Sequence, residues 1–299
     1  MTPPAVSLRF ARLPSALRYY PSAVLARREP RLPPGESVPR LEGAVEVVAV
    51  RPGHLARYRA VCGFDSDQRL LPATYPHVLA MPLHLALMTH PSFVVRLMGL
   101  VHIANEIEWL RPLPADGRYS LRAWLEGHRD TDRGQEFDLH TELADASGVA
   151  WRERSTLLAR QRGSGAQAAR SARAALRQPK PGAGEAVTEV PIEAGREIGR
   201  RYGRVSDDLN PIHIADWGAR MFGFDRAVAH GMWSMARSIA ALGPGLTPPF
   251  RVAVEFKLPL FLGSRALLHH WRSDGAWTFV LKDGEGQRPH LAGSVTRPA

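Results

Sequence analysis

The chain of 299 residues contains a single cysteine, Cys62, so it cannot form an internal disulfide or hold a metal through a cluster of its own thiolates. It also lacks any stretch that approaches the roughly 18 consecutive apolar residues that a membrane-spanning helix needs. No charged segment followed by an apolar one opens the chain, as it would in a secretory signal peptide. These absences predict a cytoplasmic protein without a membrane span.

Lysine is nearly absent, because only Lys180, Lys257 and Lys282 occur among the 39 basic residues, and arginine supplies most of the net charge of +10. A basic surface favours an anionic partner, such as nucleic acid, a membrane face or a phosphate-bearing molecule. The arginines are scattered, a zinc-finger spacing is impossible, and no RNP-like aromatic run is present, so the sequence disfavours nucleic acid. A phosphate-bearing ligand, a membrane face and a simply solvated surface stay open as interpretations of the charge.

The clearest break in the chain is at residues 160–184, which contain several Gly and Pro residues, many Ala, six basic residues and no acid. Such a composition cannot bury a core and predicts an exposed linker, partly helical near residues 166–176. We therefore expect an N-terminal domain at residues 1–160, a linker at 161–187 and a C-terminal domain at 188–299. Both domains are of ordinary size.

The C-terminal domain has helical patterns followed by strand patterns. Residues 193–202 have a helix-forming composition, and residues 232–242 are apolar on nearly every side, which is typical of a buried helix. Four strand-like runs follow, separated by short turns that mostly contain Gly: 251–262, 264–272, 276–282 and 290–295. The pattern predicts an antiparallel sheet wrapped around one helix.

The N-terminal domain repeats a similar order. Residues 78–88 are almost entirely apolar and predict a second buried helix, after a strand at 41–50 and a short helix at 55–61. Four strand-like runs come next, at 101–110, 119–126, 136–143 and 149–158. A helix followed by four strands thus occurs twice, which indicates an ancient duplication with diverged halves.

The segment from Ser206 to His213, with the sequence Ser-Asp-Asp-Leu-Asn-Pro-Ile-His, is the first candidate for chemistry. Pro211 prevents a helix from running through it and pushes Asn210 to an extended conformation, so the pair forms a turn. Across that turn Asp208 and His213 can face one cleft and share a water molecule, with Asn210 orienting them. Taken alone, the motif is more often a helix cap, a turn and a surface histidine.

A second segment, Ala229-His230-Gly231-Met232, changes that balance because it opens the buried helix. Free N–H groups at the start of a helix bind anions and developing oxyanions, and Gly231 lets the backbone approach a ligand closely. His230 is either a group that transfers protons or a residue whose ring is held by the backbone. Together the two segments predict an acid–base pair beside an oxyanion-binding helix end.

These residues resemble the MaoC-like (R)-specific enoyl-CoA hydratases, also called hydratase 2. Residues 71–77, before the first apolar helix, resemble the degenerate first half of two-domain members. The resemblance implies an α+β double hot-dog fold, in which two antiparallel sheets each wrap a long central helix. The matching positions are Tyr202, Ser206, Asp208, Asn210, Pro211, His213, Gly223, Phe224 and Ala229-His230-Gly231-Met232.

The resemblance also implies an activity, the (R)-specific hydration of a trans-2-enoyl thioester or the reverse dehydration of an (R)-3-hydroxyacyl thioester. Asp208 and His213 would hold the catalytic water, Asn210 would orient them, and the N–H of Gly231 would polarise the thioester carbonyl. Neither a metal nor a cofactor is implied beyond the coenzyme A or acyl-carrier phosphopantetheine of the substrate. The expected substrate contacts are Ser206, His230, Met232 and Lys257, of which Lys257 either contacts a phosphate or is simply a solvated charge.

The sequence departs from the family pattern at Asp207, where Gly is frequent, and we expect this carboxylate to point to solvent. His84, on the apolar N-terminal helix, either packs in the core or lines an acyl tunnel. A hot-dog acyl-thioesterase and a non-catalytic acyl-thioester-binding protein stay open as alternative functions. The expected partner is an acyl-CoA or acyl carrier protein thioester, and the expected state is a monomer or homodimer.

Overall fold

The computed structural model describes residues 5–161, 176–243 and 246–297. Its first part contains β1 (Val6–Phe10), the 3-10 helix η1 (Ala16–Tyr19), α1 (Tyr20–Leu25), β2 (Leu41–Ala49), α2 (Pro52–Cys62), α3 (Tyr75–Met88), β3 (Leu100–Trp109), β4 (Arg118–Leu125), β5 (Arg129–Thr131), β6 (Gly134–Asp145) and β7 (Gly148–Arg160). Its second part contains β8 (Thr188–Ala194), α5 (Ile198–Ser206), α6 (Pro211–Ile214), α7 (Asp216–Arg220), α8 (Gly231–Ala241), β9 (Phe250–Phe256), β10 (Ser264–Ser273), β11 (Ala276–Asp283) and β12 (Pro289–Thr296).

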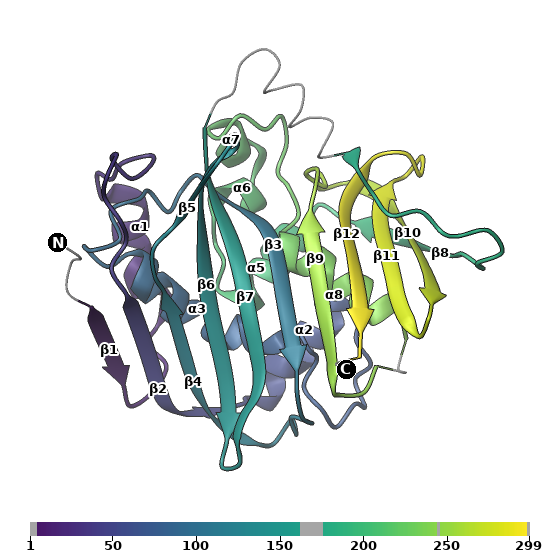
Figure 1. The fold of residues 1–299 in the computed structure, drawn as a ribbon, viewed down its shortest axis with the longest axis horizontal. Helices are drawn as coiled ribbons and strands as arrows, with labels where there is room; N and C mark the ends of the chain where they lie inside the picture. Colours follow the sequence, from purple (N-terminus) through teal and green to yellow (C-terminus); the bar gives the residue numbers. More distant parts are fainter. Residues whose placement is uncertain (1–4, 162–175, 244–245, 298–299) are drawn as a thin grey trace.

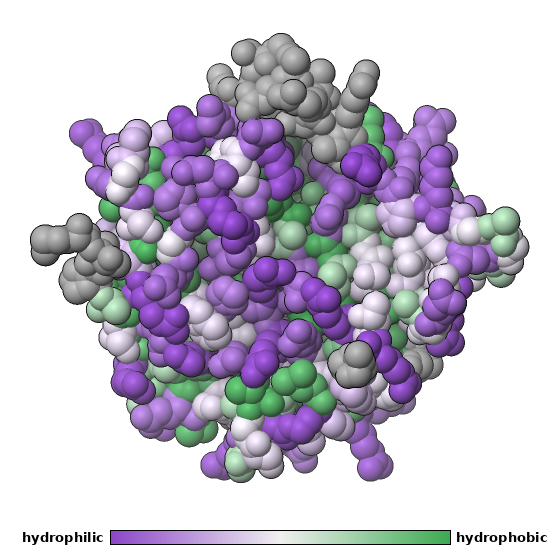
Figure 2. Space-filling model, in the orientation of Figure 1, coloured by the Kyte–Doolittle hydropathy of each residue, from purple (hydrophilic) through white to green (hydrophobic). Residues whose placement is uncertain are grey.

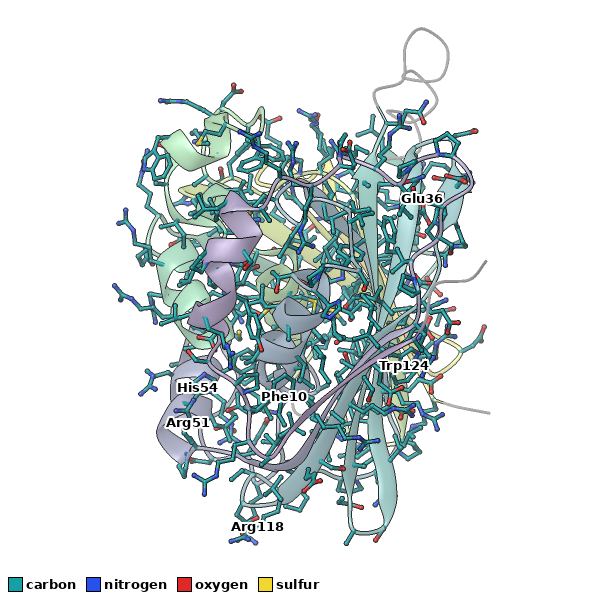
Figure 3. The ribbon with its side chains drawn as sticks, turned by 90° about the vertical axis from the view of Figure 1, so that its left-hand side faces the viewer. Phe10, Glu36, Arg51, His54, Arg118 and Trp124 are labelled. Atoms are coloured by element: carbon teal, nitrogen blue, oxygen red, sulfur yellow. The ribbon has the colours of Figure 1, made fainter. Side chains whose placement is uncertain are left out.

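The strands form one continuous sheet in the order β1-β2-β4-β6-β7-β3-β9-β12-β11-β10-β8, with β5 paired to β6. The sheet lies in front of α3 and α8 in Figure 1. The side view in Figure 3 separates the same two layers, with His54 of α2 on the helix side and Trp124 of β4 on the sheet side. The apolar residues of the core lie mainly between these layers.

The expectation of two antiparallel sheets, one around each central helix, differs from the structure in two details. The edge strands β3 and β9 pair antiparallel over Ala104–Trp109 and Phe250–Glu255, so the two halves share one sheet. Left apart, these strands would each expose a row of unpaired N–H and C=O groups. At the far edge, β1 pairs with β2 in parallel.

The structure confirms that the predicted central helices are helices and that strands follow them, although the bounds differ. Helix α3 is buried along almost its whole length, as its apolar run predicts. It begins at Tyr75, three residues before the predicted start, because Pro76 lies in its first turn, where the missing N–H costs no helical hydrogen bond. Helix α8 begins at Gly231 and is largely buried. Both helices therefore pack their apolar surfaces against the sheet.

Two predicted elements in the C-terminal part are wrong in their bounds. The helix predicted at residues 193–202 is a strand, β8, up to Ala194 and then helix α5 from Ile198. Ile192 and Ala194 alternate with exposed residues and are buried against the core, which is the pattern of a strand. The strand predicted at residues 251–262 ends at Phe256, shortly before Pro259, which has no N–H for a strand ladder.

The predicted linker is only partly described. Residues 162–175, which hold most of the stretch expected to be partly helical, lie outside the described residues. From residue 177 to residue 187 the chain forms neither helix nor strand. The domain bounds stay a prediction. Within the described parts of the chain, no helix is both long enough and apolar enough to cross a membrane.

The outer face of the sheet carries cross-strand ion pairs. Glu42 on β2 pairs with Arg122 on β4 at 2.8 Å, and Glu106 on β3 pairs with Arg154 on β7 at 3.0 Å and with Arg251 on β9 at 2.6 Å. Hydrophilic residues predominate on this face in Figure 2. Because an exposed pair contributes only about 0.2–1 kcal/mol, the apolar layer between sheet and helices supplies more of the stability.

Candidate active site

The loop after α5 carries Asp208. Ser206 is the last residue of α5, and its Oγ accepts a hydrogen bond from the Asp208 N–H at 3.2 Å. Asp207 then adopts φ 55°, a left-handed conformation that ends the helix. Oδ1 of Asp208 accepts a hydrogen bond from the Asn210 N–H at 3.2 Å. These local hydrogen bonds fix the Asp208 carboxylate and leave Oδ2 available.

Asn210 and Pro211 form the predicted turn. Asn210 has φ −55° and ψ 124°, and its side chain caps α6 by accepting a hydrogen bond from the Ile212 N–H. Pro211 occupies the first position of α6, where its fixed φ suits a helix. The turn places His213 on α6, with Nδ1 2.8 Å from the Val228 carbonyl oxygen. Since that oxygen can only accept, Nδ1 carries the proton and Nε2 has a free lone pair.

The side chain of Asp208 is ionised, and the ring of His213 is neutral. Burial raises the pKa of Asp208, but His230, His213 and the Asn210 N–H outweigh it, and the net shift is downward. Burial lowers the pKa of His213, and the Asp208 charge and the Val228 carbonyl only partly offset this effect. At neutral pH both groups therefore act as hydrogen-bond acceptors.

Oδ2 of Asp208 and Nε2 of His213 are 3.9 Å apart. This separation is too long for a direct hydrogen bond, and two acceptors cannot form one. A single water molecule that donates one hydrogen to each acceptor satisfies both. The geometry therefore fits a water molecule held by an aspartate and a histidine.

His230, the residue before α8, closes the other side of this group. Its ring stacks on His213 at a centroid distance of 3.8 Å, and its Nε2 lies 3.0 Å from the Asp208 carbonyl oxygen. Burial lowers the pKa of His230 to about 3, so the ring is neutral. Asp208, His213 and His230 are close enough to surround a metal ion. However, Nε2 is the His230 ring atom that lies 3.8 Å from Asp208 Oδ2, and it donates its proton to the Asp208 carbonyl, so its lone pair is on Nδ1 instead. As placed, the three groups therefore fit a water better than a metal.

Gly231 is the first residue of α8, and its N–H therefore has no acceptor within the helix. A Cβ atom at this position would lie 3.0 Å from the Phe256 ring, so a side chain would fit here only if that ring moved by a few tenths of an ångström. The free N–H groups of this helix end carry partial positive charge. They can stabilise negative charge on a ligand oxygen.

One cavity of about 1800 Å³ brings these groups together. It extends from α8 to α3, where Met81, Leu85 and Met88 line its wall. His84 also lines it while its buried Nε2 contacts Thr141 Oγ1 at 2.8 Å, so this residue lies in the core at the cavity wall, and an acyl tunnel at this place stays a prediction. All the residues predicted for the site line the cavity: Ser206, Asp208, Asn210, His213, His230, Gly231, Met232 and Lys257.

Comparison with known proteins gives the family. A family model described as a MaoC like domain matches residues 180–289. The chain is 31% identical to 3-hydroxyacyl-thioester dehydratase X of Mycobacterium tuberculosis over 267 residues. The aligned region covers 89% of this chain and 92% of that protein. The chain belongs to the MaoC-like dehydratase family. It is accordingly an enzyme of the hydro-lyase class, and the resemblance seen in residues 202–232 is confirmed.

Solved structures give the same fold for this MaoC-like dehydratase. A crystal structure of HtdX from Mycobacterium tuberculosis matches with a TM-score of 0.72 at 30% identity, over 85% of this chain and 99% of that chain. A MaoC-like dehydratase from Phytophthora capsici matches with a TM-score of 0.68 at 20% identity, over 86% and 95% of the two chains. The prediction of a hot-dog fold is confirmed at this level.

Two predicted side chains of the dehydratase have surroundings that the sequence did not indicate. Lys257, expected either beside a phosphate or as a solvated charge, forms an ion pair with Glu255 while it lines the cavity. Asp207, expected to point to solvent, is partly buried, and burial raises its pKa against the opposing charges of His54 and Arg51. Its positive φ gives a physical reason for the glycine that is frequent there in the family.

Tyr20 is a site residue that the sequence analysis missed. Its hydroxyl donates a hydrogen bond to the Asp207 carbonyl at 2.5 Å and accepts one from the Leu209 N–H at 2.6 Å. The phenol of α1 thus holds the backbone on both sides of Asp208. No local pattern could reveal this contact, because 187 residues separate Tyr20 from Asp207.

We expect Tyr20→Phe to lower kcat by about tenfold to a hundredfold, with a smaller change in KM. The substitution removes both hydrogen bonds to the loop, and small displacements of a reacting group are costly in rate. Steady-state kinetics together with a thermal unfolding curve measure the effect. An unchanged kcat in a folded Tyr20→Phe variant would show that the loop keeps its geometry without the phenol.

Proposed function

We propose that this chain catalyses the reversible, (R)-specific hydration of trans-2-enoyl thioesters. The observation that carries the proposal is the pair of acceptors, Asp208 Oδ2 and His213 Nε2, 3.9 Å apart in a cavity that the first residue of α8 also lines. The name of the relative, 3-hydroxyacyl-thioester dehydratase X, supports the choice of substrate. The physiological reaction is either hydration or the reverse dehydration.

In the hydration direction, the water held by Asp208 and His213 bonds through its oxygen to C3 of the enoyl group. As this bond forms, the acceptor pair takes one proton from the water and a proton is returned to C2. The net reaction adds H and OH across the double bond and returns both side chains to their initial protonation states. Negative charge that develops on the thioester oxygen is stabilised by the Gly231 N–H.

The proposed substrate supplies its own activation, because its double bond is conjugated with the thioester carbonyl. The proposed reaction uses no metal and no separate cofactor, and the phosphopantetheine of coenzyme A or acyl carrier protein is part of the substrate. The architecture in this proposal is a double hot-dog. The half with α8 provides the reacting groups, and the half with α3 shapes the acyl end of the cavity.

Crotonyl-CoA distinguishes hydration from the alternative functions. Hydration lowers the absorbance of the conjugated enoyl thioester without releasing a free thiol, and chiral analysis gives the (R)-3-hydroxy product. A thioesterase releases free thiol instead, and a non-catalytic binding protein produces neither change. Formation of the (S)-3-hydroxy product would contradict the proposed stereochemistry.

The pH dependence of kcat/KM follows from the two acceptors. Asp208 must be ionised and His213 neutral, and the pKa values of both groups are lowered. Both conditions are lost only as the pH falls, and His213 becomes protonated below the ordinary histidine value of 6.5. We therefore expect a plateau from pH 6.5 upward to the next ionisation and an acid limb below it. An acid limb centred above pH 7 would contradict the assignment of the neutral histidine.

A further inference from the structure

A second polar cluster lies on the wall of the same cavity, on the side of the N-terminal half. Nδ1 of His77 on α3 lies 2.9 Å from each carboxylate oxygen of Glu153 on β7. Nδ2 of Asn105 on β3 donates hydrogen bonds to Glu153 at 2.8 Å and to Ser155 Oγ at 3.0 Å. All four residues are buried, with at most 6% of their surface exposed, and the proposed reaction uses none of them.

Three polar atoms of this cluster and of the adjacent His102 ring are not used by these hydrogen bonds. The Glu153 carboxylate only accepts hydrogen bonds, so it fixes the Asn105 amide with Oδ1 turned away from it. Among the described residues, Asn105 Oδ1 and His102 Nε2 have no hydrogen-bond partner. His77 uses Nδ1 for Glu153, which leaves Nε2 as its second polar atom. Asn105, His102 and His77 all line the cavity.

Two of these atoms, His77 Nε2 and Asn105 Oδ1, have opposite polarity. Burial lowers the pKa of His77, but the charge and hydrogen bond of Glu153 outweigh it and favour the protonated ring, as does the contact of Nδ1 with both carboxylate oxygens; in that form Nε2 is a donor. Asn105 Oδ1 is an acceptor. In this pair the protonated His77 faces the Glu153 carboxylate, so the cluster offers no unpaired positive charge to attract a carboxylate. A hydroxyl group, which donates and accepts at once, matches this set.

The cluster lies next to the reacting end of the cavity, close enough for the Asp208 charge to contribute to the raised pKa of His77. Phe256 packs against Gly231, and its ring centroid is 4.9 Å from that of His102. The His102 ring is in turn 6.3 Å from the His77 ring. Met81, Leu85 and Met88 on the same helix as His77 give this side of the cavity an apolar wall, which suits an acyl chain better than the polar pantetheine arm, so we assign a group that contacts the cluster to the acyl chain.

We propose that His77, Asn105 and His102 form a subsite for a hydroxyl group carried by the acyl chain beyond the carbons that react. The inference rests on the proposed function, because it takes the acyl chain to lie in this cavity. A hydrocarbon chain would displace water from these polar atoms without replacing the hydrogen bonds that the water makes. Sites built to bind a hydroxyl discriminate strongly against analogues that lack it.

The test uses pairs of trans-2-enoyl-CoAs of equal length, one with a distal hydroxyl and one without, with the hydroxyl moved along the chain. We expect kcat/KM of the wild-type protein to favour the hydroxylated member by at least about tenfold at one position. Equal values at every position, or a preference for the hydrocarbon, would mean that the cluster holds only water and would overturn the proposal. This comparison needs no variant.

Asn105→Leu removes the acceptor at similar volume and is expected to reduce the hydroxyl preference about tenfold, mainly by raising kcat/KM for the hydrocarbon member. Met81→Leu is the matched control, because it changes an apolar side chain on the same cavity and leaves the preference as it is. A folded Asn105→Leu variant that keeps the full hydroxyl preference would overturn the assignment of this residue.

Crotonyl-CoA separates failure of the subsite from failure of the proposed function, because its short chain carries no distal group. If the wild-type protein does not hydrate crotonyl-CoA or any longer member of the panel, the proposed function fails. If it hydrates these substrates without a hydroxyl preference, only the subsite fails.

Discussion

Asp208→Asn is expected to lower kcat for enoyl-thioester hydration by about a thousandfold, as is usual when a general base is removed. The amide has nearly the shape of the carboxylate, but it has no charge and presents one NH₂ group that donates. It therefore cannot accept both a water hydrogen at Oδ2 and the Asn210 N–H at Oδ1. The water loses one of its two acceptors, and turnover in a steady-state assay with crotonyl-CoA measures the loss.

His213→Ala removes the other acceptor and is expected to cause a loss of similar size. Asp207→Asn is the matched control, because it neutralises the neighbouring carboxylate and asparagine tolerates the positive φ of 55° at that position. All three variants should unfold near the wild-type temperature. Wild-type rates in Asp208→Asn or His213→Ala would remove the pair from the reaction, and a large loss in Asp207→Asn would point to a general effect of charge.

The second large effect is expected at Gly231. Two substitutions there distinguish the effect of losing the backbone N–H from the effect of adding a side chain. Gly231→Ala keeps the N–H and adds a Cβ that meets Phe256 at 3.0 Å, so a moderate loss of turnover is expected. Gly231→Pro adds the same Cβ and also removes the N–H. Proline suits the first position of a helix, and His230 before it has φ −62° and ψ 136°, a conformation that proline accepts.

We expect Gly231→Pro to turn over crotonyl-CoA about a hundredfold more slowly than Gly231→Ala, which is the usual cost of one oxyanion donor. The ratio of the two variants is the informative quantity, since the contact of the new Cβ with Phe256 is common to both. Thermal unfolding checks that both retain α8. Equal rates for the two variants would show that another donor polarises the carbonyl.

The candidate site could be predicted from the sequence where its parts are close together in the chain. Asp208, Asn210 and His213 are held by one loop and one proline turn, so their residue types already carry the geometry. Gly231 was found for a similar reason, because an apolar helix begins at this glycine. The buried helices α3 and α8 could be predicted because both segments are mostly apolar.

The parts that the sequence could not provide depend on contacts between distant segments. Tyr20 forms hydrogen bonds with the backbone of Asp207 and Leu209, which are far from it in the sequence. Asn105 forms a hydrogen bond with Glu153 on another strand. An isolated tyrosine or asparagine gives no local signal of such a partner. The pairing of β3 with β9 joins the two halves into one sheet. The local sequence pattern predicts the strands but does not determine which strand edges pair.

Oxygen exchange tests the central claim most directly, because it follows the reacting water itself. The wild-type protein is incubated with (R)-3-hydroxybutyryl-CoA in water enriched in ¹⁸O, and intact thioester and free acid are analysed by mass spectrometry. We predict that reversible dehydration places the label in the C3 hydroxyl of the intact thioester, and that Asp208→Asn abolishes this exchange. Label found only in a free carboxylate, together with released coenzyme A, would contradict the account.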